Sequence, residues 1–220
     1  MDSDEIDEKE IFDIKRMLLC NAHLGSKQCN NLMKIYIWKR RRDGFFIFNV
    51  SKIMEKIKLA ARAIVAVNNK NEIIVISTGN KGEKAVLKFS YYTGCQSIIG
   101  RWTPGKLTNQ SCKNFSQPQL IIVANPNVDI QPIVESSYVN IPTIAFCNTD
   151  SSLKYIDIAI PGNTKSKHSI AFLWWMLTRE VLFLKGELYN KDEWDVPIDF
   201  FLDKNNDEEV NLRFEKYNRN

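Results

Sequence analysis

Residues 50–76 read VSKIMEKIKLAARAIVAVNNKNEIIVI and contain the two patterns that decide the fold. In the first part, apolar side chains return every three or four positions, and those sharing one face are Val50, Ile53, Ile57, Ala60, Ile64 and Val67. This spacing predicts an amphipathic helix, with Asn49 or Ser51 as its cap. The second part, Ile73–Ile76, is apolar at successive positions and too short for a helix, which indicates a strand buried on both faces.

Short apolar runs of the second kind recur along the chain, with helical patterns between them. The runs are Phe45–Phe48, Ile73–Ile76, Leu120–Val123 and Thr143–Phe146. Further helices are expected at 82–92, ending at Gly94, at 130–139, ending before Pro142, and at 168–185. Because strands and helices alternate, the sequence predicts an α/β fold in which a parallel sheet carries helices on both faces.

Composition divides the chain into three parts. Residues 1–20 form an acidic segment with a helical pattern from Ile6 to Cys20. The acidic side chains near its start would stabilise such a helix by interacting with the positive end of its dipole. Residues 21–188 hold the strands and helices of one α/β domain. Residues 189–220 are polar with scattered aromatic side chains, so we expect an extended tail that lies along the domain or along a neighbour.

Charge and cysteine usage narrow the class of protein. The 30 basic and 26 acidic residues leave a formal charge of +4, but acidic residues crowd positions 1–10 and basic ones crowd positions 39–42. The five cysteines are odd in number and widely spaced, which indicates free thiols in a reducing compartment and no zinc site. There is no secretory signal pattern and no apolar run of about 20 residues, so we expect a cytosolic or nuclear protein without a membrane span.

Two interpretations remain open for the helix expected at 168–185. Apolar residues cover both of its sides, and the second stripe includes Phe172, Trp175 and Phe183. A helix that is apolar nearly all round is buried on both sides. It either lies wedged inside its own domain or uses these three side chains to dock a protein partner.

The loops that follow the expected strands contain no catalytic constellation. Ligands of open parallel sheets gather beyond the carboxyl ends of the strands, which here are Ser77–Asn80, Ala124–Asn127 and Asn148–Ser151. The turn Thr78–Lys84 enters a helix, but it lacks the glycine and lysine spacing of dinucleotide- and phosphate-binding motifs. We therefore predict a protein that is not an enzyme and has no cofactor.

Titratable side chains are scattered as well. Those considered for acid–base or metal chemistry are His23, His168, Asp129, Asp150 and Asp157. They share no tight ligand spacing, so no metal site is predicted, and Asp150 is expected to bond within its own turn. The alternative is an α/β enzyme that binds a phosphorylated small molecule at Thr78–Lys84, with Asp150 assisting.

Two basic segments are candidates for RNA contacts. The first places Tyr36 and Trp38 beside the cations Lys39, Arg40, Arg41 and Arg42. Guanidinium groups pair with phosphates and aromatic faces stack on unpaired bases, which favours a polyanionic partner over a merely solvated surface. The second segment, 101–110, reads RWTPGKLTNQ and places Arg101 and Lys106 near Trp102. A rigid Thr103–Gly105 turn without RNA contact explains this second segment equally well.

Dispersed segments of the chain resemble one known family. They are Ala22–Gly25, Tyr36–Val50, Lys58–Ala66, Ala85–Phe89, Arg101–Gln110, Ser137–Asn140 with Pro142–Ala145, Cys147–Ser151, Asp157–Pro161, Trp174–Leu177 and Arg179–Leu182. In this order they resemble the universal small-subunit ribosomal protein family whose bacterial member is called S-two. RWTPGKLTNQ and the run NTDSSLKYIDIAIP at 148–161 favour its eukaryotic and archaeal branch, called SA or laminin-receptor precursor.

The resemblance implies a structural, non-catalytic protein of the small (40S) ribosomal subunit. Its implied fold is a three-layer flavodoxin-like, or Rossmann-like, parallel sheet with helices on both faces. Its implied partners are small-subunit rRNA and neighbouring proteins of the S-five, S-twenty-one and S-seventeen types, with no membrane and no small-molecule substrate. A role in subunit assembly, rRNA maturation and translation follows, in the cytoplasm after passage through the nucleus and nucleolus. Because the chain ends at Asn220 without the acidic extension of animal members, no laminin-receptor role is expected.

Overall fold

The centre of the fold is a parallel sheet. The structure is a computed structural model, and it describes residues 3–79, 81–112, 114–190 and 194–203. The five strands are β3 (Ile73–Ser77), β4 (Gln96–Ile99), β5 (Leu120–Val123), β6 (Thr143–Cys147) and β7 (Ile158–Pro161). Their order is β4-β3-β5-β6-β7, and all neighbours are parallel. Numbered within the sheet this is 2-1-3-4-5, the flavodoxin-like order. The predicted α/β fold is confirmed.

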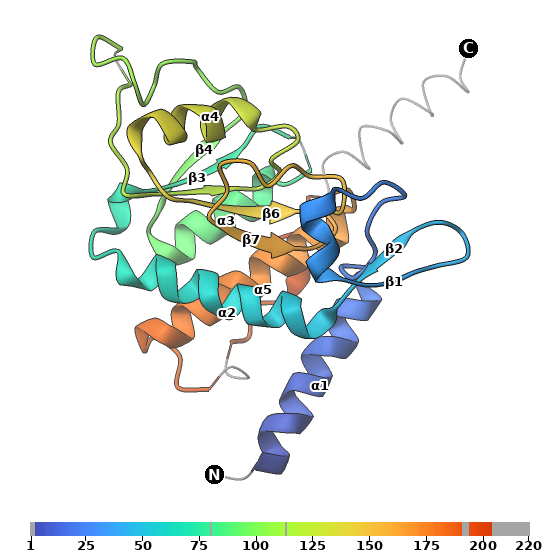
Figure 1. The fold of residues 1–220 in the computed structure, drawn as a ribbon. Helices are drawn as coiled ribbons and strands as arrows, with labels where there is room; N and C mark the ends of the chain where they lie inside the picture. The colour runs from blue at the N-terminus through green and yellow to red at the C-terminus, as the bar shows by residue number, and fades with distance from the viewer. Residues whose placement is uncertain (1–2, 80, 113, 191–193, 204–220) are drawn as a thin grey trace, which may run out of the picture.

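Helices form the two outer layers. Figure 1 shows α4 (Ile130–Val139) above the sheet, and α2 (Val50–Ala66), α3 (Glu83–Thr93) and α5 (Lys167–Lys185) below it. The Asn49 side chain accepts a bond from Ser51 N at 3.1 Å, which confirms the predicted cap of α2. Gly94 ends α3 with a φ of +76°, a left-handed conformation that glycine adopts without steric cost.

Two predictions about strands need correction. The run Phe45–Phe48 was expected in the parallel sheet, but β2 (Phe46–Phe48) pairs antiparallel with β1 (Ile37–Arg40) in a separate hairpin. Only Phe48 of β2 is fully buried, because the hairpin lies at the surface. The two edge strands of the sheet, β4 and β7, were not predicted, and neither was β1. Each is only four residues long, and the polar residues and partly exposed positions of β4 weaken its apolar pattern further.

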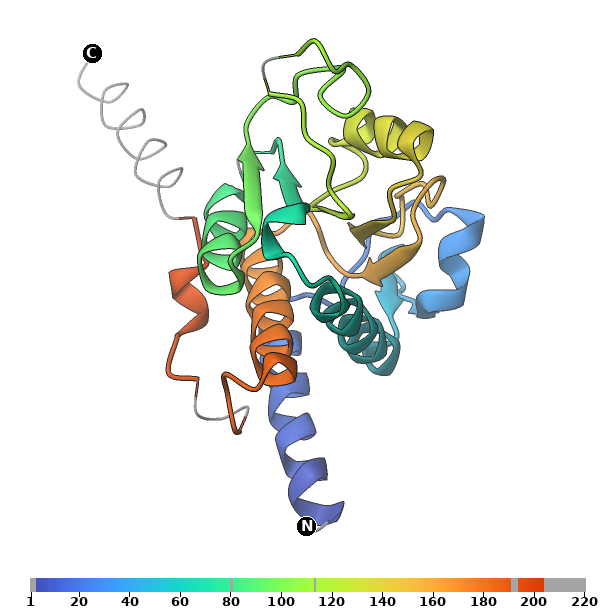
Figure 2. The same cartoon turned by 90° about the vertical axis from the view of Figure 1, so that its left-hand side faces the viewer.

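Helix α5 lies inside its own domain. Trp174 contacts the rings of Phe89 and Phe146, with centroids 5.1 and 4.8 Å apart. On the other side, Trp175 stacks on Trp194 at 5.5 Å and donates its indole N–H to Val196 O at 2.8 Å. The segment 194–203, which includes the short helix η4 (Ile198–Phe200), therefore covers the second stripe at Trp175 (Figure 2). In this part the expected extended tail lies along the domain, and residues 204–220 of that tail fall outside the described residues.

The three partner-contact candidates on α5 differ in exposure. Phe172 and Trp175 are buried at 0% and 3% exposure, so their own chain covers them and the wedged-helix interpretation describes both. Phe183 near the end of the helix is 36% exposed. Of the three side chains, Phe183 is therefore the one with an exposed surface, and its role in partner contact stays a prediction.

Helix α1 (Ser3–Leu19) extends away from the body in both views (Figures 1 and 2). Its base is held by Met17, which is fully buried, and by Asp13. Arg179 of α5 donates two parallel bonds to the Asp13 carboxylate, at 3.0 and 2.5 Å. Among the described helices, none combines the length and the apolar character that crossing a bilayer requires. The five cysteines are free thiols, as predicted.

Candidate nucleic-acid interface

The basic run lies at the tip of the β1–β2 hairpin, at the right of Figure 1. The turn is closed by bonds from Arg41 N to Phe45 O at 2.7 Å and from Gly44 N to Arg41 O at 3.0 Å. Gly44 has a φ of +88°, so a residue without a Cβ suits this turn. The Arg40 side chain also donates to Gly44 O at 3.2 Å. The tip is therefore an ordered turn.

The predicted cations of this run all face solvent. Exposed side chains there are Lys39, Arg40, Arg41 and Arg42, with Trp38 exposed at 70%. Arg41 forms an ion pair with Asp43 at 3.0 Å, in which both side chains are 59% exposed. An exposed pair of this kind contributes little stability, so it leaves Arg41 ready to exchange its partner for a phosphate.

The base of the hairpin rests on residues 23–26. Gly25 N donates to Phe46 O at 2.8 Å, and Phe48 N donates to His23 O at 2.9 Å. Leu24 forms an isolated antiparallel bridge with Ile47. Residues 23–26 thus act as a third strand that fixes the hairpin relative to the body.

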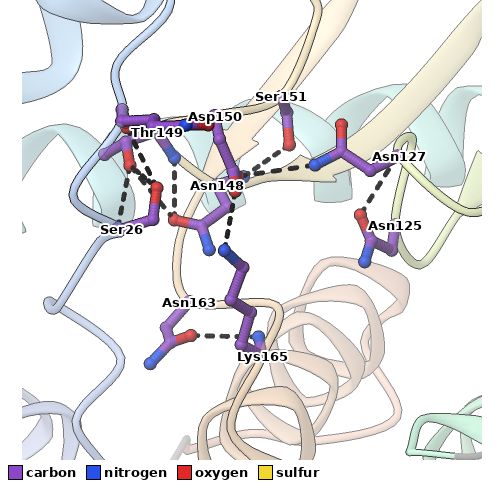
Figure 3. A network of polar contacts seen from close by, with 10 residues as sticks. Ser26, Asn125, Asn127, Asn148, Thr149, Asp150, Ser151, Asn163 and Lys165 are labelled. Atoms are coloured by element: carbon purple, nitrogen blue, oxygen red, sulfur yellow. Dashed lines mark hydrogen bonds and ion pairs between the residues drawn. The ribbon is translucent and has the colours of Figure 1, made fainter.

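The segment that supports the hairpin is itself held in place. A polar network at the carboxyl end of β6 fixes residues 23–30 (Figure 3). The hydroxyl of Thr149 accepts a bond from Ser26 N at 2.8 Å and lies 2.8 Å from Ser26 Oγ. Thr149 O accepts from Asn30 N at 2.8 Å. The turn itself is closed by Asn148, whose side chain accepts from Thr149 N at 2.7 Å, and by Ser151 Oγ, which accepts from Asn148 N at 3.1 Å. Because Asn148, Thr149 and Ser151 are buried, this network serves to position the hairpin.

Asp150 differs from its neighbours and corrects a prediction. Its carboxylate was expected to bond within its own turn, but it pairs with Lys165 Nζ at 2.7 Å and accepts from Asn127 Nδ2 at 3.4 Å. Figure 3 shows these bonds joining the loops after β5, β6 and β7. The turn bonds that were assigned to Asp150 are made by Asn148 instead.

A cleft of about 570 Å³ opens between the hairpin and these strand ends. Its charged or aromatic lining residues are Lys27, Arg41, Asp43, Phe45, Asp150 and Lys165. Of these, sequence reasoning singled out only Arg41 and Asp150 as possible site residues. Lys27, Phe45 and Lys165 carry no local motif, and only the pairing of residues 23–26 with β2 brings them together.

The RWTPGKLTNQ segment forms a loop that is tied to α4. Trp102 is buried at 5% exposure, and its indole N–H donates to Glu135 Oε2 at 3.3 Å. Gly105 N donates to Glu135 Oε1 at 2.9 Å. The Trp102 ring therefore has no exposed face on which an RNA base can stack. This corrects the suggestion that Trp102 joins Arg101 and Lys106 in an RNA contact. Arg101 is exposed and Lys106 is half-buried, and burial lowers the pKa of Lys106.

A second pocket, of about 320 Å³, lies at the switch point between β3 and β5. Its lining includes Ser77, Gly82 and Asp129. Asp129 accepts bonds from the backbone N–H and hydroxyl of Thr78, while its Oδ2 is buried without a hydrogen-bond partner among the described residues. Burial raises the pKa of Asp129 to about 6, so the carboxyl is mainly ionised at neutral pH. The lining holds this carboxylate beside the cations Lys81 and Lys165, so Asp129 repels a bound phosphate while the two lysines attract it.

The two histidines occupy separate places. His168 lies exposed in the first turn of α5, whereas His23 lies under the hairpin, where burial lowers its pKa. Among the residues that the structure describes, no three His, Cys, Asp or Glu side chains gather as metal ligands would.

Comparisons with known proteins point to one family. The chain matches the family model described as Ribosomal protein S2 over residues 17–116 and 111–182. It is 53% identical over 190 residues to small ribosomal subunit protein uS2 of Drosophila persimilis, covering 86% of this chain and 70% of the relative. It is 47% identical over 205 residues to the uS2 protein of Podospora anserina, covering 93% and 70%. The uS2 protein of Chlamydomonas reinhardtii is 48% identical over 190 residues, covering 86% and 68%.

Proposed function

Because the chain belongs to the ribosomal protein S2 family, we propose that it is a structural component of the small ribosomal subunit whose β1–β2 hairpin contacts rRNA. Family membership implies rRNA and ribosomal proteins as partners and the cytoplasmic ribosome as the location. The contact residues proposed on the hairpin are Lys39, Arg40, Arg41 and Arg42. Arg101 and Lys106 are proposed as a second, smaller phosphate contact.

The observation that carries the RNA proposal is a rigid, exposed and basic hairpin tip. Its cations project from an ordered turn, and the turn rests on a buried network around Thr149. A preorganised set of cations loses less conformational freedom on binding phosphates than a flexible tail does. The polyanionic backbone of RNA is the partner that such a surface fits.

Finer aspects of the function are also proposals. The chain acts without catalysis, as membership of a ribosomal protein family implies. It belongs to the eukaryotic SA branch, which the animal, fungal and algal relatives support. Neighbouring ribosomal proteins, of the S-five, S-twenty-one and S-seventeen types, contact the molecule near Phe183 and the exposed side chains Ile11 and Phe12 of α1. Assembly takes it through the nucleolus.

The test of the hairpin is the triple variant Arg40→Ala, Arg41→Ala and Arg42→Ala. Each lost phosphate contact lowers the slope of log K against log salt by about one unit, so we expect a loss of up to about three units in binding to an rRNA fragment. Incorporation into small subunits should fall with it.

A matched control removes three exposed cations elsewhere, namely Lys15, Arg62 and Lys154. It should keep the slope within about one unit of the unaltered chain. If the hairpin variant behaves like this control in both RNA binding and incorporation, the hairpin is not the rRNA contact.

A further inference from the structure

The cleft between the hairpin and the strand ends has the features of a nucleotide site. We propose that it receives one unstacked nucleotide of the bound RNA, with the phosphate against its basic rim and the base against Phe45. This inference rests on the RNA-binding function proposed above and assigns a specific site within it. The hairpin tip then supplies general affinity, and the cleft supplies a preference for RNA with an extruded base.

The rim of the cleft brings together cations from three separate segments. Lys27 comes from the segment under the hairpin, Arg41 from the hairpin turn and Lys165 from the loop before α5. Arg41 is paired with Asp43 at 3.0 Å and Lys165 with Asp150 at 2.7 Å. Each pair is neutral overall, so the net positive charge of the rim comes from Lys27, and Arg41 and Lys165 bind a phosphate by exchanging their carboxylate partners for it.

One wall of the cleft offers an aromatic face. Phe45, at the end of the hairpin turn, is 39% exposed, although Phe48 in the adjoining strand β2 is buried. The Lys27 ammonium lies 5.3 Å from the centre of the Phe45 ring. This exposed cation–π contact is weak enough for a base to replace it, and the flexible lysine is then able to move to the phosphate of the same nucleotide. Stacking on an aromatic ring is how proteins hold unpaired RNA bases.

The remaining lining provides hydrogen bonds for a base edge. Gln28 lines the cleft, Asn163 keeps one N–H beyond its bonds to Asn21 O and Lys165 N, and Asp150 keeps acceptor capacity beyond its bonds to Lys165 and Asn127. A carboxylate accepts from the exocyclic amino group of adenine, cytosine or guanine. Adenosine is therefore a suitable base for a first test.

The size and rigidity of the cleft also fit a single nucleotide. Its volume of about 570 Å³ lies within the range of about 300–1,000 Å³ that is typical of small-ligand sites. Its floor is fixed by the bonds between Ser26 and Thr149 at 2.8 Å. Because the backbone of the cleft is preformed, binding requires only side chains to move.

The experiment compares two labelled RNA hairpins, one fully paired and one with a single bulged adenosine, in binding to the full chain. The unaltered chain should bind the bulged RNA about tenfold more tightly. Phe45→Ala should remove most of this preference while leaving affinity for the paired RNA, and Phe45→Tyr should keep it. Tyr138→Ala removes an exposed aromatic on α4, outside both the cleft and the hairpin, and should leave the preference intact.

The outcomes separate the cleft from the hairpin. Equal binding of both RNAs by the unaltered chain, or a preference that survives Phe45→Ala, overturns the cleft assignment. If paired RNA still binds through Arg40–Arg42 in that case, the proposed function stands without the cleft. If neutralising Arg40–Arg42 has no effect on either RNA, it is the proposed function that fails.

Discussion

Removing the Glu135 side chain is the sharpest perturbation of the RWTPGKLTNQ loop. Glu135 is 3% exposed and accepts from Trp102 Nε1 at 3.3 Å, from Gly105 N at 2.9 Å and from Gln131 Nε2 at 2.9 Å. In Glu135→Ala, the Trp102 and Gly105 N–H groups lose their acceptor. Each stranded buried donor costs about 1–3 kcal/mol. Relief of the buried carboxylate's desolvation offsets part of this, so we expect a net loss of about 3 kcal/mol in the free energy of unfolding.

Glu135→Gln is the matched control for this loop. Its amide oxygen still accepts from Gly105 N, and only the longer bond from Trp102 is lost, so we expect a loss of about 1 kcal/mol. Equilibrium unfolding in urea measures both losses. Trypsin cleavage after Arg101 and Lys106 measures opening of the loop, which should be faster in Glu135→Ala than in Glu135→Gln.

A Glu135→Ala chain that unfolds within about 0.5 kcal/mol of the unaltered chain, the usual size of a neutral surface change, and that trypsin cleaves no faster would show that Glu135 does not hold the loop. Equal losses in both variants would show that the negative charge, and not the geometry of the bonds, holds the loop.

Three further predictions concern the core and the support of the hairpin. In Gly25→Ala the new Cβ would come 2.4 Å from Thr149 Cγ2, so the free energy of unfolding in urea should fall by about 1–3 kcal/mol. Adding Thr149→Ser removes that methyl group and should recover most of the loss. No recovery would contradict the close contact. The pKa of Asp129 is raised from 3.8 to about 6, so its ionised form lowers the stability of the fold above pH 6 and not below pH 4. Asp129→Asn should therefore be about 2 kcal/mol more stable than the unaltered chain at pH 7.5, and this difference should vanish near pH 4. A difference that does not change with pH would exclude ionisation of Asp129 as its cause. Asp13→Ala leaves the buried Arg179 charge uncompensated and should lower the free energy of unfolding, measured by thermal unfolding, by about 3–5 kcal/mol. Adding Arg179→Met should restore much of this stability. If the double variant is no more stable than Asp13→Ala alone, the unpaired Arg179 charge is not the cause of the loss.

Sequence reasoning located the helices well because their signals are local. The pattern at 130–139 predicted α4 to the residue, since Pro142 and the end of the apolar spacing mark its limit. The helix expected at 168–185 begins one residue earlier, at Lys167. The run Phe45–Phe48 misled because an apolar run does not reveal whether its partner strand is parallel or antiparallel. That choice depends on the turn at Gly44 and on residues 23–26, which pair with β2 in space although no sequence motif connects them to it.

The candidate site was predicted only where its residues form a local sequence pattern. Lys39–Arg42 were visible as a charge run, and the structure places them on the surface as expected. Trp102 was considered beside Arg101 and Lys106 as part of an RNA contact, but it is buried and bonded to Glu135, which lies 33 positions away in the sequence. Lys27, Phe45 and Lys165 form the cleft only through tertiary pairing, so no local spacing indicates them.

Sedimentation through a sucrose gradient tests the central claim most directly. A structural component of the small subunit should co-migrate with that subunit in high salt, where electrostatic contacts alone are weakened. The tagged full chain is therefore expected in the small-subunit fractions. A chain that stays at the top of the gradient, while the subunits sediment without it, would contradict the assignment to the ribosome.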